Sequence, residues 1–145
     1  MQTNPHLKQP VSELLIVATL VDSDNERLRC LPAIAGIRCT LLENTIYDAL
    51  GLICDSYNGG YWNYYKLSNG GFYMAPQSDA TFRLSCENYF EGEVSANTAG
   101  IIATASAYST LSFLNGGECF ANAYHQLSDF IFQQRDAGLI RAALD

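Results

Sequence analysis

Positive charge is scarce in this sequence of 145 residues. Eight Lys and Arg residues stand against 15 Asp and Glu residues, which gives a formal net charge of −7. Direct binding to nucleic acid requires a basic face that displaces counterions, so the composition argues against a nucleic-acid-binding protein. It favours a soluble acidic protein or one with an electropositive protein partner.

Motifs for metals and phosphates are also lacking. The five cysteines include no Cys-x-x-Cys pair, and the two histidines, His6 and His125, lie far apart in the sequence. We therefore expect no zinc site and no cofactor, and we expect reduced, mostly buried thiols. The glycine pairs are not part of a phosphate-binding loop, because no Gly-Lys-Ser/Thr follows them.

Long hydrophobic segments are missing as well. The longest apolar run, Leu14 to Val21, is too short to span a bilayer, and the N-terminus lacks the basic start and apolar core of a signal peptide. We therefore expect a cytoplasmic protein. Because 48% of the residues are apolar and only 16% are charged, the composition predicts one folded domain over residues 1–145, with residues 1–10 as a loose leader.

The most informative segment runs from Tyr57 to Pro76. It is rich in aromatic residues, contains the only Trp, and has two Asn-Gly-Gly triplets. Alternating aromatic residues around an Asn-Gly pair are typical of a β-hairpin. The pattern predicts strands over 61–67 and 71–75, joined by a turn at 68–70.

Two further strands are predicted after the hairpin, over 81–86 and 90–95. Tight turns make neighbouring strands antiparallel, so the four strands should form one meander. The expected fold class is α+β, in which this small meander of about four strands packs against several α-helices.

Helices are expected on both sides of the meander. One should run from Glu43 to Cys54, with Asn44 or Thr45 as its cap. Another should start after Ser95, and a third should run from the Gly116-Gly117 pair to about Gly138, followed by a last turn over 139–144. Before these helices, residues 12–21 fit a helix capped by Ser12 or a strand equally well. We expect a polar turn over residues 22–26 and one short helical turn over residues 27–34, interrupted at Pro32.

Motifs over most of the chain after residue 27 are similar to those of a known family. Tyr57-x-Gly59-Gly60-Tyr61-Trp62 is followed by Leu67-Ser68-Asn69-Gly70-Gly71-Phe72-Tyr73-Met74-Ala75-Pro76. Leu28-x-x-Leu31-Pro32 precedes them, and Phe90-Glu91-Gly92-Glu93-x-Ser95-Ala96-x-x-Ala99-Gly100-Ile101 follows. On these motifs the chain resembles the ArdB/KlcA antirestriction family.

The resemblance implies a bacterial protein of plasmids or other mobile elements that helps incoming DNA evade type I restriction-modification enzymes. The family is not defined by a catalytic site or a cofactor. We therefore expect a protein without catalytic activity that contacts the type I restriction complex, or a host factor that controls it, directly or indirectly.

Eight residues are candidates for a recognition surface, because Trp and Tyr dominate binding hot spots and Asn-Gly loops present polar groups. They are Tyr57, Asn58, Tyr61, Trp62, Tyr64, Asn69, Phe72 and Tyr73. The alternative is that the aromatic residues pack in the core and the loops only shape turns. Alternation places Tyr61 and Tyr65 on one face and Trp62 and Tyr64 on the other, so one set should be core. We expect Trp62 to be largely structural.

Two other functions are considered. Cys54, Asp55, His125 and Asp129 offer the residue types of a small thiol- or His-dependent hydrolase, but the apolar stripe through Leu127 leaves His125 and Asp129 on the solvated side of their helix. An acidic mimic of a dozen DNA base pairs would need about two dozen phosphate-like charges. The acids here are fewer and scattered, with a mild cluster only at residues 22–26.

Overall fold

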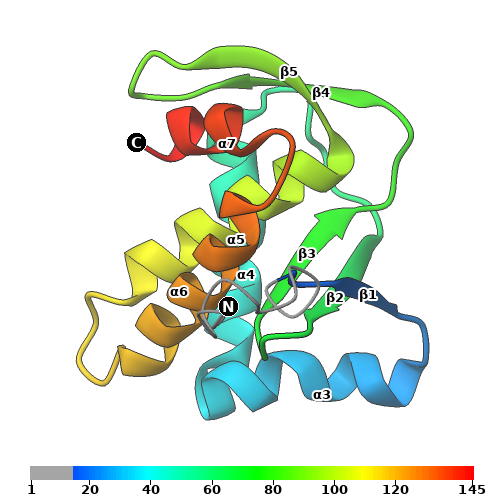
Figure 1. Cartoon of the computed structure of the whole chain (residues 1–145), viewed down its shortest axis with the longest axis vertical. Helices are drawn as coiled ribbons and strands as arrows, with labels where there is room; N and C mark the ends of the chain where they lie inside the picture. The colour runs from blue at the N-terminus through cyan, green and yellow to red at the C-terminus, as the bar shows by residue number, and fades with distance from the viewer. Residues whose placement is uncertain (1–14) are drawn as a thin grey trace, which may run out of the picture.

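The computed structural model describes residues 15–145, so the predicted leader over residues 1–10 and the possible cap at Ser12 lie outside the described residues. Figure 1 shows the order of the elements along the chain. The strands are β1 (Ala18–Val21), β2 (Trp62–Leu67), β3 (Phe72–Pro76), β4 (Thr81–Ser85) and β5 (Glu91–Ser95). The helices are α3 (Asp24–Ala35), the 3₁₀ turn η1 (Gly36–Arg38), α4 (Cys39–Ile53), α5 (Ala96–Leu111), α6 (Glu118–Phe132) and α7 (Ala137–Leu144).

The strands form two antiparallel sheets. β1, β2 and β3 make one sheet in that order, and β4 pairs only with β5 among the described strands. The α+β class is therefore confirmed, but the prediction of one continuous four-strand meander is wrong. β3 and β4 do not pair, and the third strand of the first sheet is β1, from the segment before α3.

The outer edge of β3 is covered by α5, which explains why β4 does not continue the sheet. The Met74 backbone N–H donates to Thr104 Oγ1 over 3.3 Å, and the Thr104 hydroxyl donates to the Met74 carbonyl over 3.2 Å. The Tyr108 hydroxyl donates to the Phe72 carbonyl over 2.9 Å. Side chains of a helix thus take the place of a further strand. Gly100 allows this close approach, because a Cβ there would overlap Ala75 and the Met74 carbonyl.

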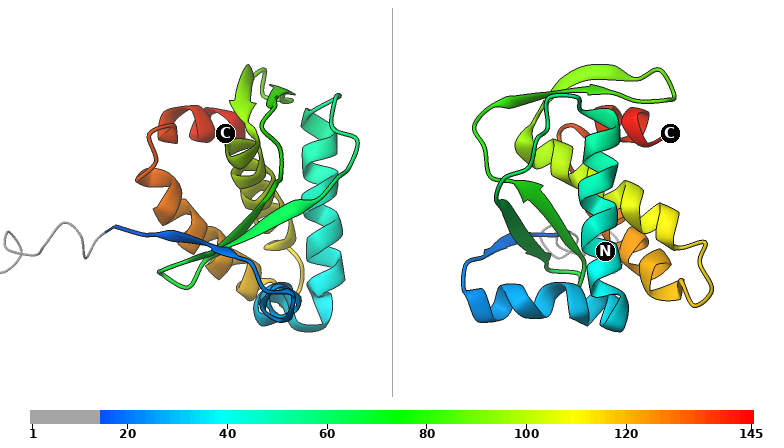
Figure 2. Two further views of the ribbon diagram at one scale, coloured as in Figure 1. Left: turned by 90° about the vertical axis from the view of Figure 1, so that its right-hand side faces the viewer. Right: turned by 180° about the vertical axis from the view of Figure 1, so that it is seen from behind.

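α5 is the centre of the molecule. It contacts β3, α4, α6 and α7, and its side chains are buried on almost every face. The two views in Figure 2 show α5 between α4 on one side and α6 on the other. Its start was predicted correctly, because the Ser95 side chain accepts a hydrogen bond from the Thr98 backbone N–H.

Before residue 60, one open alternative is resolved and the predictions for α3 and α4 need correction. The ambiguous segment 12–21 contains the strand β1, and α3 is a full helix that begins at Asp24 after the cap Ser23 and continues through Pro32. The interior proline costs helix stability. Cys30 and Leu31 before it and Ala35 after it are buried against the core, which offsets that cost.

α4 begins at Cys39 rather than Glu43, and neither Asn44 nor Thr45 caps it, because both lie inside the helix. Its N-cap position, Arg38, makes no side-chain capping hydrogen bond, so the sequence carries no cap signal there. The later helix α6 ends at Phe132 rather than near Gly138, and Gly138 lies within α7.

Within residues 15–145, no helix combines the length and the apolar character needed to cross a membrane. All five cysteines are free thiols, with Cys30 and Cys54 buried and the other three partly buried. Burial raises the pKa of the Cys30 and Cys86 thiols above its ordinary value, which lowers their reactivity.

Candidate functional site

Four of the eight candidate recognition residues lie in the core. Trp62, Tyr64, Phe72 and Tyr73 are each at most 7% exposed. The Trp62 ring meets Tyr47 of α4 edge to face with centroids 5.3 Å apart, and its Nε1–H donates to the Tyr57 hydroxyl over 3.0 Å. Trp62 is therefore buried, as its structural interpretation predicts.

The other buried aromatic residues tie the hairpin to its neighbours. Tyr64 packs edge to face on Phe72, with ring centroids 5.4 Å apart. Tyr73 stacks between Tyr65 and Phe130 of α6, and its hydroxyl donates to Asn97 Oδ1 over 2.7 Å. Burial raises the pKa of Tyr64 and Tyr73, so both phenols stay neutral at physiological pH.

Asn69 fastens the hairpin tip to α6. Its Nδ2 donates to the Gln126 carbonyl over 2.9 Å, and Gln126 Nε2 donates to the Asn69 carbonyl over 3.3 Å. The Asn69 side-chain oxygen also accepts from the Gly71 N–H over 3.0 Å, which shapes the turn in which Gly70 has φ 91°. These reciprocal bonds give Asn69 a structural role at the hairpin tip.

The remaining three candidates, Tyr57, Asn58 and Tyr61, belong to one loop that lines a groove. This groove, about 410 Å³ in volume, lies between residues 56–61 and residues 76–82. Gly59 and Gly60 have φ of 101° and 123°, and the open space around both leaves the backbone accessible. Asn58 is exposed, and the Tyr61 side chain is 56% exposed.

The walls of this groove, which we call the signature groove, are held in place from both sides. The Gln77 backbone N–H donates to the Tyr61 carbonyl over 2.8 Å, which joins the two loops. The Arg27 guanidinium of α3 lies over the Tyr61 ring at 4.7 Å and over the Tyr64 ring at 4.2 Å. Such cation–π contacts orient Tyr61 while leaving much of its ring open to solvent.

Sequence reasoning missed the second wall of the signature groove and the role of Arg27. Gln77 and Ser78 fall between the strands predicted over 71–75 and 81–86, and they line the groove opposite Tyr57 and Tyr61. No local sequence pattern indicates that these two loops will face each other across a groove. The one available hint was that a polar turn follows the hairpin directly at Pro76.

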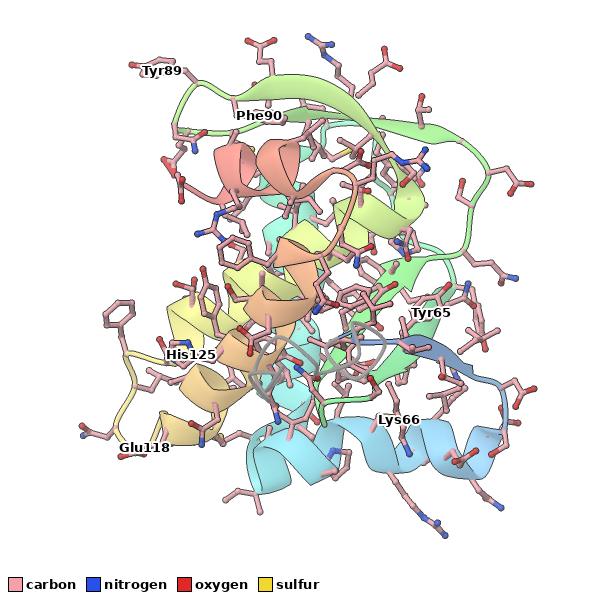
Figure 3. All side chains as sticks on the ribbon, viewed as in Figure 1. Tyr65, Lys66, Tyr89, Phe90, Glu118 and His125 are labelled. Atoms are coloured by element: carbon pink, nitrogen blue, oxygen red, sulfur yellow. The ribbon has the colours of Figure 1, made fainter. Side chains whose placement is uncertain are left out.

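The residues proposed for a hydrolase are not brought together. Cys54 is buried at the end of α4 and shares a hydrogen bond of 3.4 Å with Ser56, whereas His125 and Asp129 are exposed on α6, as their helical position predicts. α5 lies between α4 and α6 (Figure 2), and Figure 3 shows His125 on the outer side of α6. Residues 15–145 contain no group of three or more His, Cys, Asp and Glu side chains able to hold a metal ion.

The mild acidic cluster has a local structural explanation. Asp24 and Glu26 lie in the first turn of α3, where negative charge interacts favourably with the helix dipole. Glu26 also approaches Lys66 of β2, with 3.8 Å between Oε2 and Nζ. These carboxylates thus serve the start of α3, which weakens the case for a DNA-like row of charges.

Comparison with known proteins gives a consistent result. Residues 55–145 match the family model described as antirestriction protein. An antirestriction protein KlcA of Escherichia coli is 41% identical over 138 residues, covering 90% of this chain and 94% of the relative. The uncharacterized protein YafX of Escherichia coli strain K12 is 32% identical over 142 residues, covering 94% and 91%.

A solved structure extends the similarity to the fold. It is reported for the KlcA and ArdB proteins, with a novel fold and antirestriction activity against type I DNA restriction systems in vivo but not in vitro. It aligns with a TM-score of 0.82 at 35% sequence identity and covers 100% of both chains.

Proposed function

This chain belongs to the antirestriction protein family, and we propose that it relieves type I restriction of incoming DNA through protein contacts rather than by catalysis. The similarity to KlcA over nine-tenths of the chain carries the proposal, together with the fold shared with the KlcA and ArdB structure. The family resemblance drawn from the motifs is thereby confirmed. Because restriction enzymes cut DNA inside the cell, the proposed place of action is the cytoplasm.

The absence of catalysis is supported by the placement of the candidate catalytic groups. Cys54 and His125 are carried by helices on opposite sides of α5, and nucleophilic catalysis requires a base within hydrogen-bonding reach of the nucleophile. The activity reported for KlcA and ArdB in vivo but not in vitro supports an indirect partner, namely a cellular factor that a purified reaction lacks.

The signature groove is the proposed contact surface. It combines an exposed aromatic side chain, Tyr61, with an exposed amide, Asn58, on a loop held by Gln77 and Arg27. A pre-organised aromatic residue with polar neighbours is typical of a binding hot spot. The buried aromatic residues of the same motif hold the loop in place from beneath.

Plating of unmodified phage on a restricting host that expresses the protein tests the function. The wild type should restore plating, whereas Tyr61→Ala and Asn58→Ala should lose most of that effect with unchanged thermal melts. Phe113→Ala is the matched control, because Phe113 is 87% exposed on the loop between α5 and α6. Full restriction in the presence of soluble wild-type protein would overturn the function, and normal activity of Tyr61→Ala would overturn the assignment of the surface.

The same assay separates the two alternatives. A hydrolase requires that Cys54→Ala or His125→Ala abolish relief of restriction, and we expect both variants to remain active. An acidic DNA mimic requires tight, salt-sensitive binding to the purified restriction enzyme, and we expect a titration at low salt to show none.

A further inference from the structure

A second groove lies apart from the signature loops, between α4, α5, α7 and the turn that joins β4 to β5. Its volume is about 520 Å³. The view from behind in Figure 2 looks onto this side of the molecule, with α4 in front and α7 beside its upper end. None of the eight candidate recognition residues lines it, so it is independent of the surface proposed above.

Two rows of small or apolar side chains form the floor. Each row follows one helix at four-residue spacing: Thr45, Ala49 and Ile53 on α4, and Ile102, Ser106 and Thr110 on α5. Each row spans nine residues, whose first and last members are about 12 Å or slightly more than two helical turns apart. Two helices that present small side chains along a shared groove match the shape of a third helix, as in helix-in-groove recognition.

The rim of this groove is acidic. Asp48 of α4 and Glu87 of the β4–β5 turn are both exposed, and the groove is lined by no Lys or Arg from residues 15–145. Leu52, which is 83% exposed, adds apolar surface beside Asp48. A second copy of this chain, with its net charge of −7, is electrostatically disfavoured as the occupant, whereas a segment with basic flanks is favoured.

The wall that carries Glu87 is held rigidly. Asn88 Nδ2 donates to the Ala142 carbonyl over 2.9 Å and to the Ala143 carbonyl over 3.4 Å at the end of α7, and Asn88 Oδ1 accepts from the Phe90 N–H over 3.1 Å. The turn is thereby fastened to α7. A groove whose walls are fixed before binding loses little conformational entropy when it is filled.

We propose that this groove docks an amphipathic helix of a partner protein, with apolar side chains on its inner face and Lys or Arg on its flanks. The floor of small and apolar side chains accepts the inner face, while Asp48 and Glu87 pair with the flanking charges. The proposal concerns a binding surface and does not depend on relief of restriction, so the two are tested separately.

Fluorescence anisotropy with three synthetic 15-residue peptides tests the docking. The first has Leu at helical spacing with Lys and Arg on its flanks, the second has the same Leu residues with Glu on the flanks, and the third is a scrambled version of the first. We expect the basic amphipathic peptide alone to bind the wild-type protein, with amide shifts in an NMR titration centred on Ala49 and Ser106.

Charge-reversal variants separate the effect of the acidic groove residues on binding from the effect of the protein's net charge. Asp48→Lys with Glu87→Lys should weaken binding of the basic peptide by at least about tenfold, which corresponds to 1.4 kcal/mol. Asp22→Lys with Asp129→Lys changes the net charge by the same amount at exposed acids outside the groove and should leave binding within about twofold. Ser106→Leu fills the floor while keeping every charge, and it should also weaken binding.

Three results would overturn the proposal. The first is no binding of the basic amphipathic peptide at millimolar concentration. The second is equal binding of the scrambled peptide, and the third is equal weakening by both charge-reversal pairs, which would show only attraction to an acidic protein. Circular dichroism of each variant confirms that it folds, and all the charge reversals are at exposed positions.

Discussion

Replacing Gly100 by Ala tests the close contact between α5 and β3 directly. A Cβ at position 100 would lie far inside the roughly 3.5 Å contact distance of carbon atoms, against Ala75 Cα and the Met74 carbonyl oxygen. Both obstacles are backbone atoms, which cannot rotate away. α5 must therefore move off the strand.

The expected cost has several parts. Overpacking of a close contact costs about 1–3 kcal/mol. Displacement of α5 also stretches the buried hydrogen bonds from Thr104 and Tyr108 to β3, and an unsatisfied buried group costs about 1–3 kcal/mol. The better helix propensity of Ala returns about 1 kcal/mol. We expect a net loss of about 1–5 kcal/mol, against the roughly 5–15 kcal/mol of a typical domain.

Urea denaturation followed by circular dichroism measures this loss, and Gly51→Ala is the matched control. Gly51 lies in α4, and nothing stands within 4 Å of a Cβ built there. Gly51→Ala should therefore stabilise the protein by about 0.5–1 kcal/mol through propensity alone. The two identical substitutions should thus shift the unfolding midpoint in opposite directions. A Gly100→Ala variant within about 1 kcal/mol of the wild type would refute the reasoning.

Three other predictions concern single side chains. Tyr89, at the tip of the β4–β5 turn in Figure 3, has φ 71° and is 93% exposed. Tyr89→Asn should therefore relieve about 1 kcal/mol of backbone strain and raise the melting temperature by about 2–4 °C. An unchanged melting temperature would contradict the presence of strain. Tyr108→Phe leaves the Phe72 carbonyl without its buried donor and should cost about 1–3 kcal/mol in urea denaturation, whereas a neutral result would show that the hydrogen bond contributes nothing net. Burial raises the pKa of Tyr108 and Tyr73, and burial together with the Glu43 hydrogen bond raises the pKa of Tyr47, so above about pH 10 the unfolded chain loses phenolic protons that the folded chain keeps. The free energy of unfolding should therefore fall by up to about 1.4 kcal/mol per pH unit for each of these Tyr residues, and less steeply in Tyr108→Phe. A flat profile between about pH 10 and 11 would contradict this prediction.

Elements with a strong local signal could be predicted from the sequence. The Ser95 cap marks the start of α5, and the Asn69-Gly70 turn marks the β2–β3 hairpin, because both structures are decided by residues close in the chain. α3 was underestimated because Pro32 is unfavourable in a helix, and only burial of its neighbours in the folded protein outweighs that cost.

Strand pairing could not be predicted, because its cause lies far away in the sequence. No residue pattern within β3 or β4 indicates that Thr104 and Tyr108 will occupy the free edge of β3. Pairing of β1 with β2 likewise joins Val21 to Tyr64, across the whole of α3 and α4. Such contacts depend on the assembled molecule rather than on local propensity.

The candidate site was predicted in part. Alternation correctly placed Trp62 and Tyr64 on one face of β2 and Tyr65 on the other, whereas Tyr61 precedes the strand. It could not decide which face is covered, since both carry aromatic residues. Both faces are packed, because Trp62 meets Tyr47 of α4 and Tyr73 stacks between Tyr65 and Phe130 of α6. Tyr61 is exposed because it lies in the loop before β2.

The order of synthesis adds a consequence to the way α5 covers β3. The ribosome adds Thr104 and Tyr108 roughly 30 residues after the strand that they satisfy. At about 5–20 residues per second, the hairpin waits on the order of seconds with an open edge. An open edge is a template for pairing with another chain. The growing polypeptide is therefore most prone to misassembly in this interval, and a message truncated before Ala96 would make that state permanent.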